Sequence, residues 1–231
     1  MPTSPELAGG AGFTFEGAVA AYYLTALLAE GHAPGIADRT VTRVALQQRD
    51  FGQPLDDVIV DLVAPDGNPA TLSLQCKRKL VISDARTSSD FREVIRDAWA
   101  TLSLPGFREG VDRFGAAVGE VAMGPGRAMR ALCEAARGSP ELADFEVRMA
   151  ATGNANAAMG KIHRAVSSLL GEVSAGCASP GDVHRLLAHF VLLEFDFLHE
   201  GAVDPPQAVD RLALVRGASG PVGWAAALAA R

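Results

Sequence analysis

Apolar residues at helical spacing dominate the first part of the chain. They recur three and four positions apart after Phe13, which predicts an amphipathic helix with Thr14 as its N-cap and an end at Gly31. The positions on its apolar face are Val19, Ala20, Tyr23, Leu24, Leu27 and Leu28. Residues 1–12 are small, polar and rich in glycine, so we expect a flexible tail there.

Three strand-like segments follow the predicted helix. Residues 41–48 begin with β-branched side chains, and residues 57–63 and 70–79 alternate apolar and polar positions. Between the last two segments lies Pro-Asp-Gly-Asn-Pro, at residues 65–69, in which every residue favours a turn. The sequence therefore predicts a β-hairpin.

The remainder of the chain is mostly helical in pattern. A helix capped by Ser88 or Ser89 carries an apolar stripe and ends before Pro105, and a fourth strand is predicted at 114–121. Periodicity leaves residues 191–198 open between a strand and the end of a helix. Further helices are predicted at 127–136, 155–173, 182–190, 207–215 and, in an Ala-rich stretch, 223–231.

Composition narrows the class of protein. The 231 residues are 48% apolar, which fits one sizeable domain, or a domain with a satellite. No apolar run of about 18 residues and no secretory signal are present, so we expect a cytoplasmic protein with no membrane partner. The three cysteines lie far apart, which predicts reduced, mostly buried thiols.

The charge balance limits binding to nucleic acid. The chain holds 21 Lys and Arg against 27 Asp and Glu, so its net charge of −6 gives no general attraction to phosphates. One stretch is locally basic, and it would contact a phosphate backbone without reading base sequence. Its residues are Lys77, Arg78, Lys79 and Arg86, with Arg92 and Arg96 nearby. The alternative is an exposed strand end kept soluble by charge.

The predicted hairpin gathers side chains that can perform chemistry. A turn centred near Gly67 sets Asp57 opposite Lys77, with Gln75 on the same face, while Asp56 points to the other face. A carboxylate and an amide oxygen can hold a hard cation such as Mg²⁺, and a neighbouring lysine can position an attacking water. The alternative is a solvated hairpin face whose Asp–Lys pair adds about 0.2 to 1 kcal/mol.

The order of these motifs resembles the PD-(D/E)xK nuclease superfamily. The matching segments are Leu-Asp-Asp-Val at 55–58, Leu-Gln-Cys-Lys at 74–77, and Gly-Phe-Thr-Phe-Glu at 12–16, which opens the first helix. Within the superfamily, the chain is most similar to the double-stranded-DNA endonuclease domain at the N-terminus of bacterial anti-phage effectors. These include CD-NTase-associated endonucleases and STAND-type NTPase proteins. The resemblance covers residues 10–125 by motif.

The resemblance assigns roles to individual residues. Asp57 matches the metal-binding aspartate, Gln75 the second ligand and Lys77 the catalytic lysine, while Asp56 is held in reserve as a ligand that a bulge would bring in. Glu16 matches an acid on the first helix; the alternative is an ordinary first-turn acid that complements the helix dipole. Gln75 replaces the commoner Glu or Asp, which removes one negative charge and weakens the expected affinity for metal.

The resemblance also implies a fold and domain organisation. We expect an α/β, restriction-endonuclease-like core with a central mixed sheet flanked by helices over residues 13–125, followed by a mostly helical extension over 126–231. The chain contains no recognisable sensor or P-loop, and its unpunctuated end at Arg231 favours a fragment of a longer protein. A sensor or NTPase domain is expected on the same chain or on a partner chain.

The function implied is metal-dependent hydrolysis of double-stranded DNA in bacterial antiviral defence, activated when the chain forms a homo-oligomer. The cofactor would be Mg²⁺, with Mn²⁺ as a substitute. Two alternatives stay open: a catalytically silent DNA-binding or oligomerisation module of the same fold, and an RNA-directed nuclease.

Overall fold

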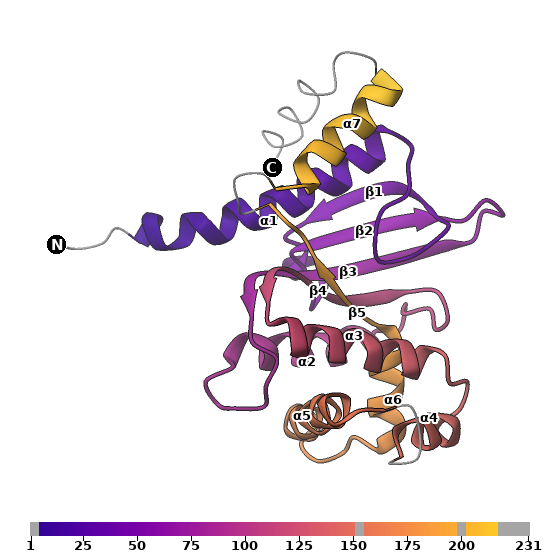
Figure 1. Cartoon of the computed structure of the whole chain (residues 1–231). Coiled ribbons are helices and arrows are strands. Elements are labelled where there is room, and N and C mark those ends of the chain that lie inside the picture. The colour runs from indigo at the N-terminus through magenta and orange to yellow at the C-terminus, as the bar shows by residue number, and fades with distance from the viewer. Residues whose placement is uncertain (1–4, 151–154, 198–201, 217–231) are drawn as a thin grey trace.

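A five-stranded mixed sheet forms the centre of the molecule, with helices on both faces (Figure 1). The computed structural model describes residues 5–150, 155–197 and 202–216. The strands lie side by side in chain order; β1, β2 and β3 are antiparallel, and β3, β4 and β5 are parallel. This confirms the α/β class and the mixed sheet. The strands are β1 (Thr40–Leu46), β2 (Val58–Val63), β3 (Pro69–Leu80), β4 (Arg113–Val121) and β5 (Phe190–Glu194).

The predicted hairpin joins β2 to β3. In its turn the Asp66 side chain accepts a hydrogen bond from the Asn68 N–H at 3.0 Å, and Gly67 has a φ of 84°, which glycine adopts without strain. Val63 pairs with Pro69, so the turn is centred on Asp66 and the register differs by two residues from the prediction. The prediction that Asp57 lies opposite Lys77 was therefore wrong.

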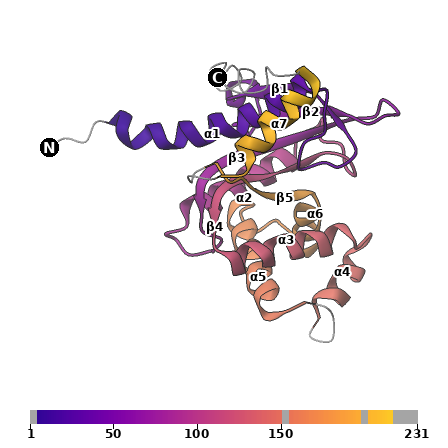
Figure 2. The same cartoon turned by 45° about the horizontal axis from the view of Figure 1, so that its top comes forward.

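One face of the sheet is covered by α1 (Pro5–Leu28) and α7 (Asp204–Arg216), which lie side by side (Figures 1 and 2). Tyr22 of α1 packs against Phe195 and stacks under the guanidinium of Arg211. The helix begins at Pro5, so the predicted start at Phe13 and cap at Thr14 were wrong, and residues 5–12 are helical instead of forming a tail. Proline at the first helical position loses no hydrogen bond, which allows this earlier start.

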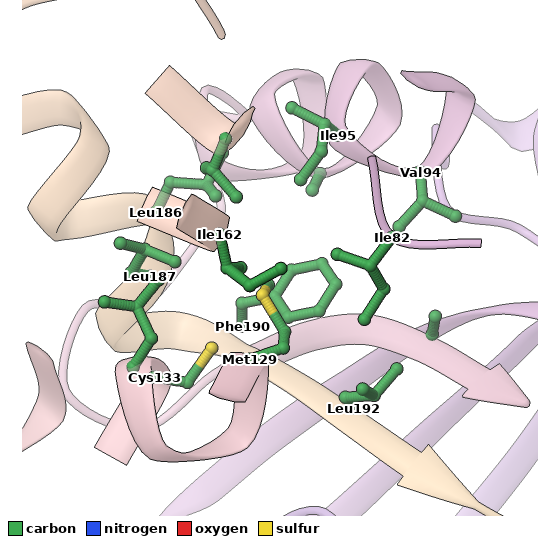
Figure 3. Close-up of a cluster of buried hydrophobic side chains, with 14 of the residues drawn as sticks. Ile82, Val94, Ile95, Met129, Cys133, Ile162, Leu186, Leu187, Phe190 and Leu192 are labelled. Carbon is green, nitrogen blue, oxygen red and sulfur yellow. The ribbon is translucent and has the colours of Figure 1, made fainter. Parts of the chain in front are cut away.

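The other face carries the larger apolar core (Figure 3). Its helices are α2 (Ser89–Leu102), α3 (Met123–Arg137), α4 (Leu142–Met149), α5 (Ala157–Val173) and α6 (Pro180–His189). The stripe predicted on α2 is buried, although Ser88 caps the helix without a side-chain hydrogen bond. The short helix α4 was not predicted, because it buries fully only Phe145.

The open question at residues 191–198 is answered for 191–194 by β5, which pairs in parallel with β4, while residues 195–197 form neither strand nor helix and residue 198 lies outside the described residues. The two strands approach closely at the pair of Gly115 and Val191. A Cβ on Gly115 would lie 1.8 Å from the Val191 carbonyl oxygen, so glycine is needed there. A strand from the part expected as a helical extension thus completes the sheet. The division at residue 125 stays a prediction, and the helix predicted at 223–231 lies outside the described residues.

The composition predicted a protein with no membrane partner and with reduced, mostly buried thiols. In the described part of the chain, no helix is long and apolar enough to cross a membrane. All three cysteines are free: Cys133 is buried, Cys76 is half-buried and Cys177 is exposed.

Candidate functional site

The structure brings Asp57, Gln75 and Lys77 together at the end of the hairpin remote from its turn. Asp57 immediately precedes β2, and its Oδ2 accepts a hydrogen bond from the Cys76 N–H at 2.6 Å. Continued by one residue, the β2–β3 register places Asp57 opposite Gln75. Alternation along β3 then puts Gln75 and Lys77 on the face that α2 covers.

The Asp57 carboxyl group lies in surroundings that favour its neutral form. Burial raises its pKa from 3.8 to about 6, and the nearby carboxylates of Glu16 and Asp56 add to the effect. The Cys76 N–H and Lys77 act in the opposite direction but do not compensate. Among the described residues, none forms a salt bridge with Asp57. A cation at this position would relieve the cost of burying the charge.

Gln75 contributes a polar atom without a partner. The residue is 5% exposed, and its Oε1 is buried with no hydrogen bond from any described group. An unsatisfied buried acceptor costs about 1 to 3 kcal/mol, so such an atom in a native protein requires an explanation. A ligand that binds the amide oxygen supplies one.

The side-chain oxygen atoms of Asp57 and Gln75 are suitable ligands for a hard cation. Oxygen atoms from Asp57 and Gln75 are the ligands that Mg²⁺ prefers, and the unsatisfied Oε1 is the observation that supports the fit. The described residues include no group of three or more His, Cys, Asp or Glu side chains placed to hold a metal ion. A cation at this position would therefore depend on the Gln75 amide, as the sequence implied.

Glu16 lies beside this pair, on the middle of α1. Since the helix begins at Pro5, Glu16 is not in its first turn, and the interpretation as a dipole-complementing acid was wrong. Burial raises the pKa of Glu16, as does Asp56, while the hydrogen bond from the Gln47 side chain lowers it. Gln47 also donates its backbone N–H to the Asp57 carbonyl at 3.3 Å, so it connects Glu16 to Asp57.

Gln47 was not identified from the sequence. It has a φ of 52°, a left-handed conformation that is rare for a residue with a Cβ atom and that is concentrated at functional sites. A single glutamine after a strand shows no pattern that would reveal this role.

Lys77 is held by a second residue that the sequence did not reveal, Glu93 of α2. The Lys77 Nζ lies 2.6 Å from the Glu93 Oε2, and this hydrogen bond lowers the pKa of Glu93, with further contributions from Arg96 and Arg49. The ammonium group is thereby fixed on the Gln75 side of β3. The one signal for Glu93 was its position beside the apolar stripe of α2, next to Val94.

Asp56 has a different partner. Its carboxylate is almost fully buried and accepts hydrogen bonds from Arg49 Nε at 3.2 Å and Nη2 at 2.8 Å. Arg49 belongs to the short 3-10 helix η1 (Arg49–Phe51) and also reaches Asp97 of α2 at 3.3 Å. Arg49 thus neutralises Asp56, whereas Asp57 keeps no such partner.

We expect Arg49→Ala to lower the free energy of unfolding by about 2 kcal/mol, because it leaves the buried Asp56 carboxylate uncompensated. The matched control is Arg43→Ala on β1, whose pair with Asp61 is exposed and is expected to contribute less than about 1 kcal/mol. Urea denaturation of both variants measures the difference. Equal losses in the two variants would contradict this account of Asp56.

The basic residues predicted to contact DNA surround the end of β3. Arg78 and Arg86 are exposed and form no ion pair with any described residue, while the exposed Lys79 lies 3.6 Å from Glu120. Arg92 and Arg96 instead pair with Glu172 and Asp97. Arg78 and Arg86 are therefore the most available for a phosphate backbone.

Comparisons with known proteins give likenesses to solved structures, among them two Cap4 receptors. No family model matches the chain, and no curated protein matches its sequence. The Cap4 SAVED/CARF-domain containing receptor of Moraxella osloensis is similar with a TM-score of 0.40 and 14% identity, over 89% of this chain and 37% of that one. The Acinetobacter baumannii Cap4 SAVED/CARF-domain containing receptor with the cyclic trinucleotide 3'3'3'-cAAA is similar with a TM-score of 0.46 and 9% identity, over 88% and 37%. The chain spans 37% of the length of both receptors, and at these TM-scores neither likeness carries an argument about its function.

Proposed function

We propose that this chain is a metal-dependent endonuclease domain that hydrolyses phosphodiester bonds of double-stranded DNA. The observation that carries the proposal is the buried, unsatisfied Oε1 of Gln75, opposite a carboxyl group of raised pKa and on the same face as Lys77. The sequence resemblance to PD-(D/E)xK nucleases assigns catalytic roles to the same residues.

The residues of the candidate site would have two roles in hydrolysis: binding the metal ion and positioning the reacting groups. Asp57, Gln75 and Glu16 would hold Mg²⁺, or Mn²⁺ in its place, and the bound ion would neutralise phosphate charge and make an attacking water more acidic. The Lys77 ammonium, oriented by Glu93, would donate hydrogen bonds that position the water and the phosphate oxygen. The shielded position of Gln75 on the α2 face would strengthen these electrostatic contacts.

Arg78, Arg86 and Lys79 would hold the DNA backbone around the end of β3 without reading sequence, with Arg78 on the opposite face of the strand from Lys77. With a net charge of −6, a single chain would bind DNA weakly, and several copies brought together would bind it through added contacts. This agrees with the second part of the proposal, that the chain is an effector of bacterial antiviral defence activated by oligomerisation. That part rests on the sequence resemblance and implies a sensor or NTPase domain as partner.

The experiment is digestion of supercoiled plasmid, single-stranded DNA and RNA in parallel, with Mg²⁺, with Mn²⁺ or with EDTA, over a wide range of protein concentration. We expect cleavage of plasmid that requires the metal and rises more than proportionally with protein concentration. Cleavage of RNA alone would favour an RNA-directed nuclease. No cleavage at any concentration with either metal would favour a silent module and contradict the proposal.

A further inference from the structure

A basic cavity lies at the opposite end of the sheet from the candidate site. Its volume is about 450 Å³, and it is bounded by the start of β4, the end of α3 and the helix α6. Arg113, which lines the cavity, pairs in register with Leu72, whereas Lys77 pairs with Val118 farther along β4. Its charged and titratable lining consists of Glu109, Arg113, Arg137, His184, Arg185 and His189.

The arginines of this cavity have few acidic partners. Arg113 donates to the Asp112 carbonyl at 2.8 Å, and Arg137 donates to the carbonyls of Ala188 at 3.2 Å and Phe190 at 3.0 Å. Neither forms a salt bridge with a described carboxylate. Elsewhere in the described chain, carboxylates pair with Arg43, Arg49, Arg92, Arg96, Arg108 and Arg130.

Arg185 adds a further unsatisfied donor. Its guanidinium pairs with the exposed Glu109, yet its Nε is buried and has no hydrogen-bond partner among the described groups. Three guanidinium groups and one carboxylate thus line the cavity, which leaves an excess of two positive charges. An anion bound in the cavity would offset this excess of charge.

The electrostatic surroundings of the cavity favour the binding of an anion. Burial lowers the pKa of Arg113 most, and the neighbouring Arg137 and, to a lesser extent, Arg39 lower it further, while Asp112 opposes them. Burial also lowers the pKa of His189, with Arg113 and Arg185 acting in the same direction and Asp112 and Glu109 opposing it. Arg113 and Arg137 thus lie close together without a salt bridge to a described carboxylate, at a cost that a bound anion would offset.

We propose that this cavity binds a phosphate group through Arg113, Arg137 and Arg185. Planar guanidinium groups present two parallel N–H donors that match phosphate oxygens, and arginine suits half-buried anion sites because it is weakly hydrated. The cavity is within the size range of small-ligand sites, so it has room for a phosphate with part of its ester group. The phosphate comes from a DNA backbone or from a free phosphorylated molecule.

The test titrates inorganic phosphate into the full chain at constant ionic strength, with EDTA present and chloride as reference, and follows the unfolding midpoint. Arg137→Gln and Arg185→Gln are compared with Arg127→Gln, an exposed arginine of α3 outside the cavity. Phosphate is expected to stabilise the wild type beyond chloride, with an apparent Kd that rises at least about tenfold in the two cavity variants and is unchanged in Arg127→Gln.

Two results would overturn the proposal: stabilisation by phosphate no greater than by chloride, or wild-type affinity in both cavity variants. If one cavity variant does not fold, the other and the ¹⁵N shift of the Arg185 Nε in wild-type protein, which must move with phosphate, decide the question. Binding of a short duplex DNA then separates the sources. A loss in Arg137→Gln but not in Arg127→Gln assigns the phosphate to DNA, and unchanged DNA binding assigns it to a free phosphorylated molecule.

Discussion

Asp57→Asn is expected to make the metal-free protein more stable at pH 8 by about 2 kcal/mol while abolishing cleavage. Burial raises the pKa of Asp57 from 3.8 to about 6, and each unit corresponds to about 1.4 kcal/mol, reduced here by partial contact with solvent. The neutral amide keeps an oxygen that can accept the Cys76 N–H but carries no buried charge. A gain in stability coupled to a loss of activity is typical of a functional group held in an unfavourable environment.

The sign follows from proton binding. The folded chain binds the Asp57 proton more tightly than the unfolded chain, so this contribution to stability is complete below pH 3.8 and is lost as the pH rises through about 6. Urea denaturation in EDTA from pH 4 to 8 measures it, and the curve of the variant should be flatter over this range. Asp61→Asn, on the strand β2 that Asp57 precedes, is the control: it loses its pair with Arg43 and should gain nothing. A loss of stability in Asp57→Asn at pH 8 would contradict the assignment.

Lys77→Ala is expected to lower the rate of plasmid cleavage by about 10² to 10⁴-fold, because the reaction loses the group that positions the water and phosphate. Its effect on stability should be below about 1 kcal/mol, since the partner Glu93 is partly exposed. Single-turnover cleavage rates, measured with the unfolding midpoint of the same protein, separate the two effects.

The matched control for Lys77→Ala is Lys161→Ala, an exposed lysine of α5 that removes the same charge far from the hairpin. Its cleavage rate should equal that of the wild type. If Lys77→Ala cleaves plasmid at a rate within twofold of the rates of the wild type and of Lys161→Ala, Lys77 takes no part in the reaction.

Local chemistry made the hairpin predictable, but not its exact register. The run 65–69 identifies a turn, because each residue favours one, yet several centres are compatible with it. The Asn68 carbonyl accepts the Ala64 N–H, which centres the turn on Asp66 and moves each pair by two residues. A shift of two residues preserves the faces of both strands, so the residues predicted to share a face still do.

The parts of the site that could not be predicted depend on contacts distant in sequence. Glu93 meets Lys77 because α2 packs over β3, and Gln47 meets Glu16 because β1 ends beside α1. Neither residue belongs to a local pattern that signals chemistry. The same limit applied to β5, since an apolar run is equally consistent with a buried strand or a helix until its neighbour, here β4, is known.

The central claim, that Asp57 and Lys77 belong to a metal-dependent nuclease centre, is tested most directly by plasmid cleavage in Mg²⁺. Wild type, Asp57→Asn, Lys77→Ala and Lys161→Ala are assayed side by side at equal concentration, each shown to be folded. The account predicts cleavage by wild type and Lys161→Ala, its loss in EDTA, and none by Asp57→Asn or Lys77→Ala. Equal cleavage by all four proteins, or cleavage that persists in EDTA, would contradict it.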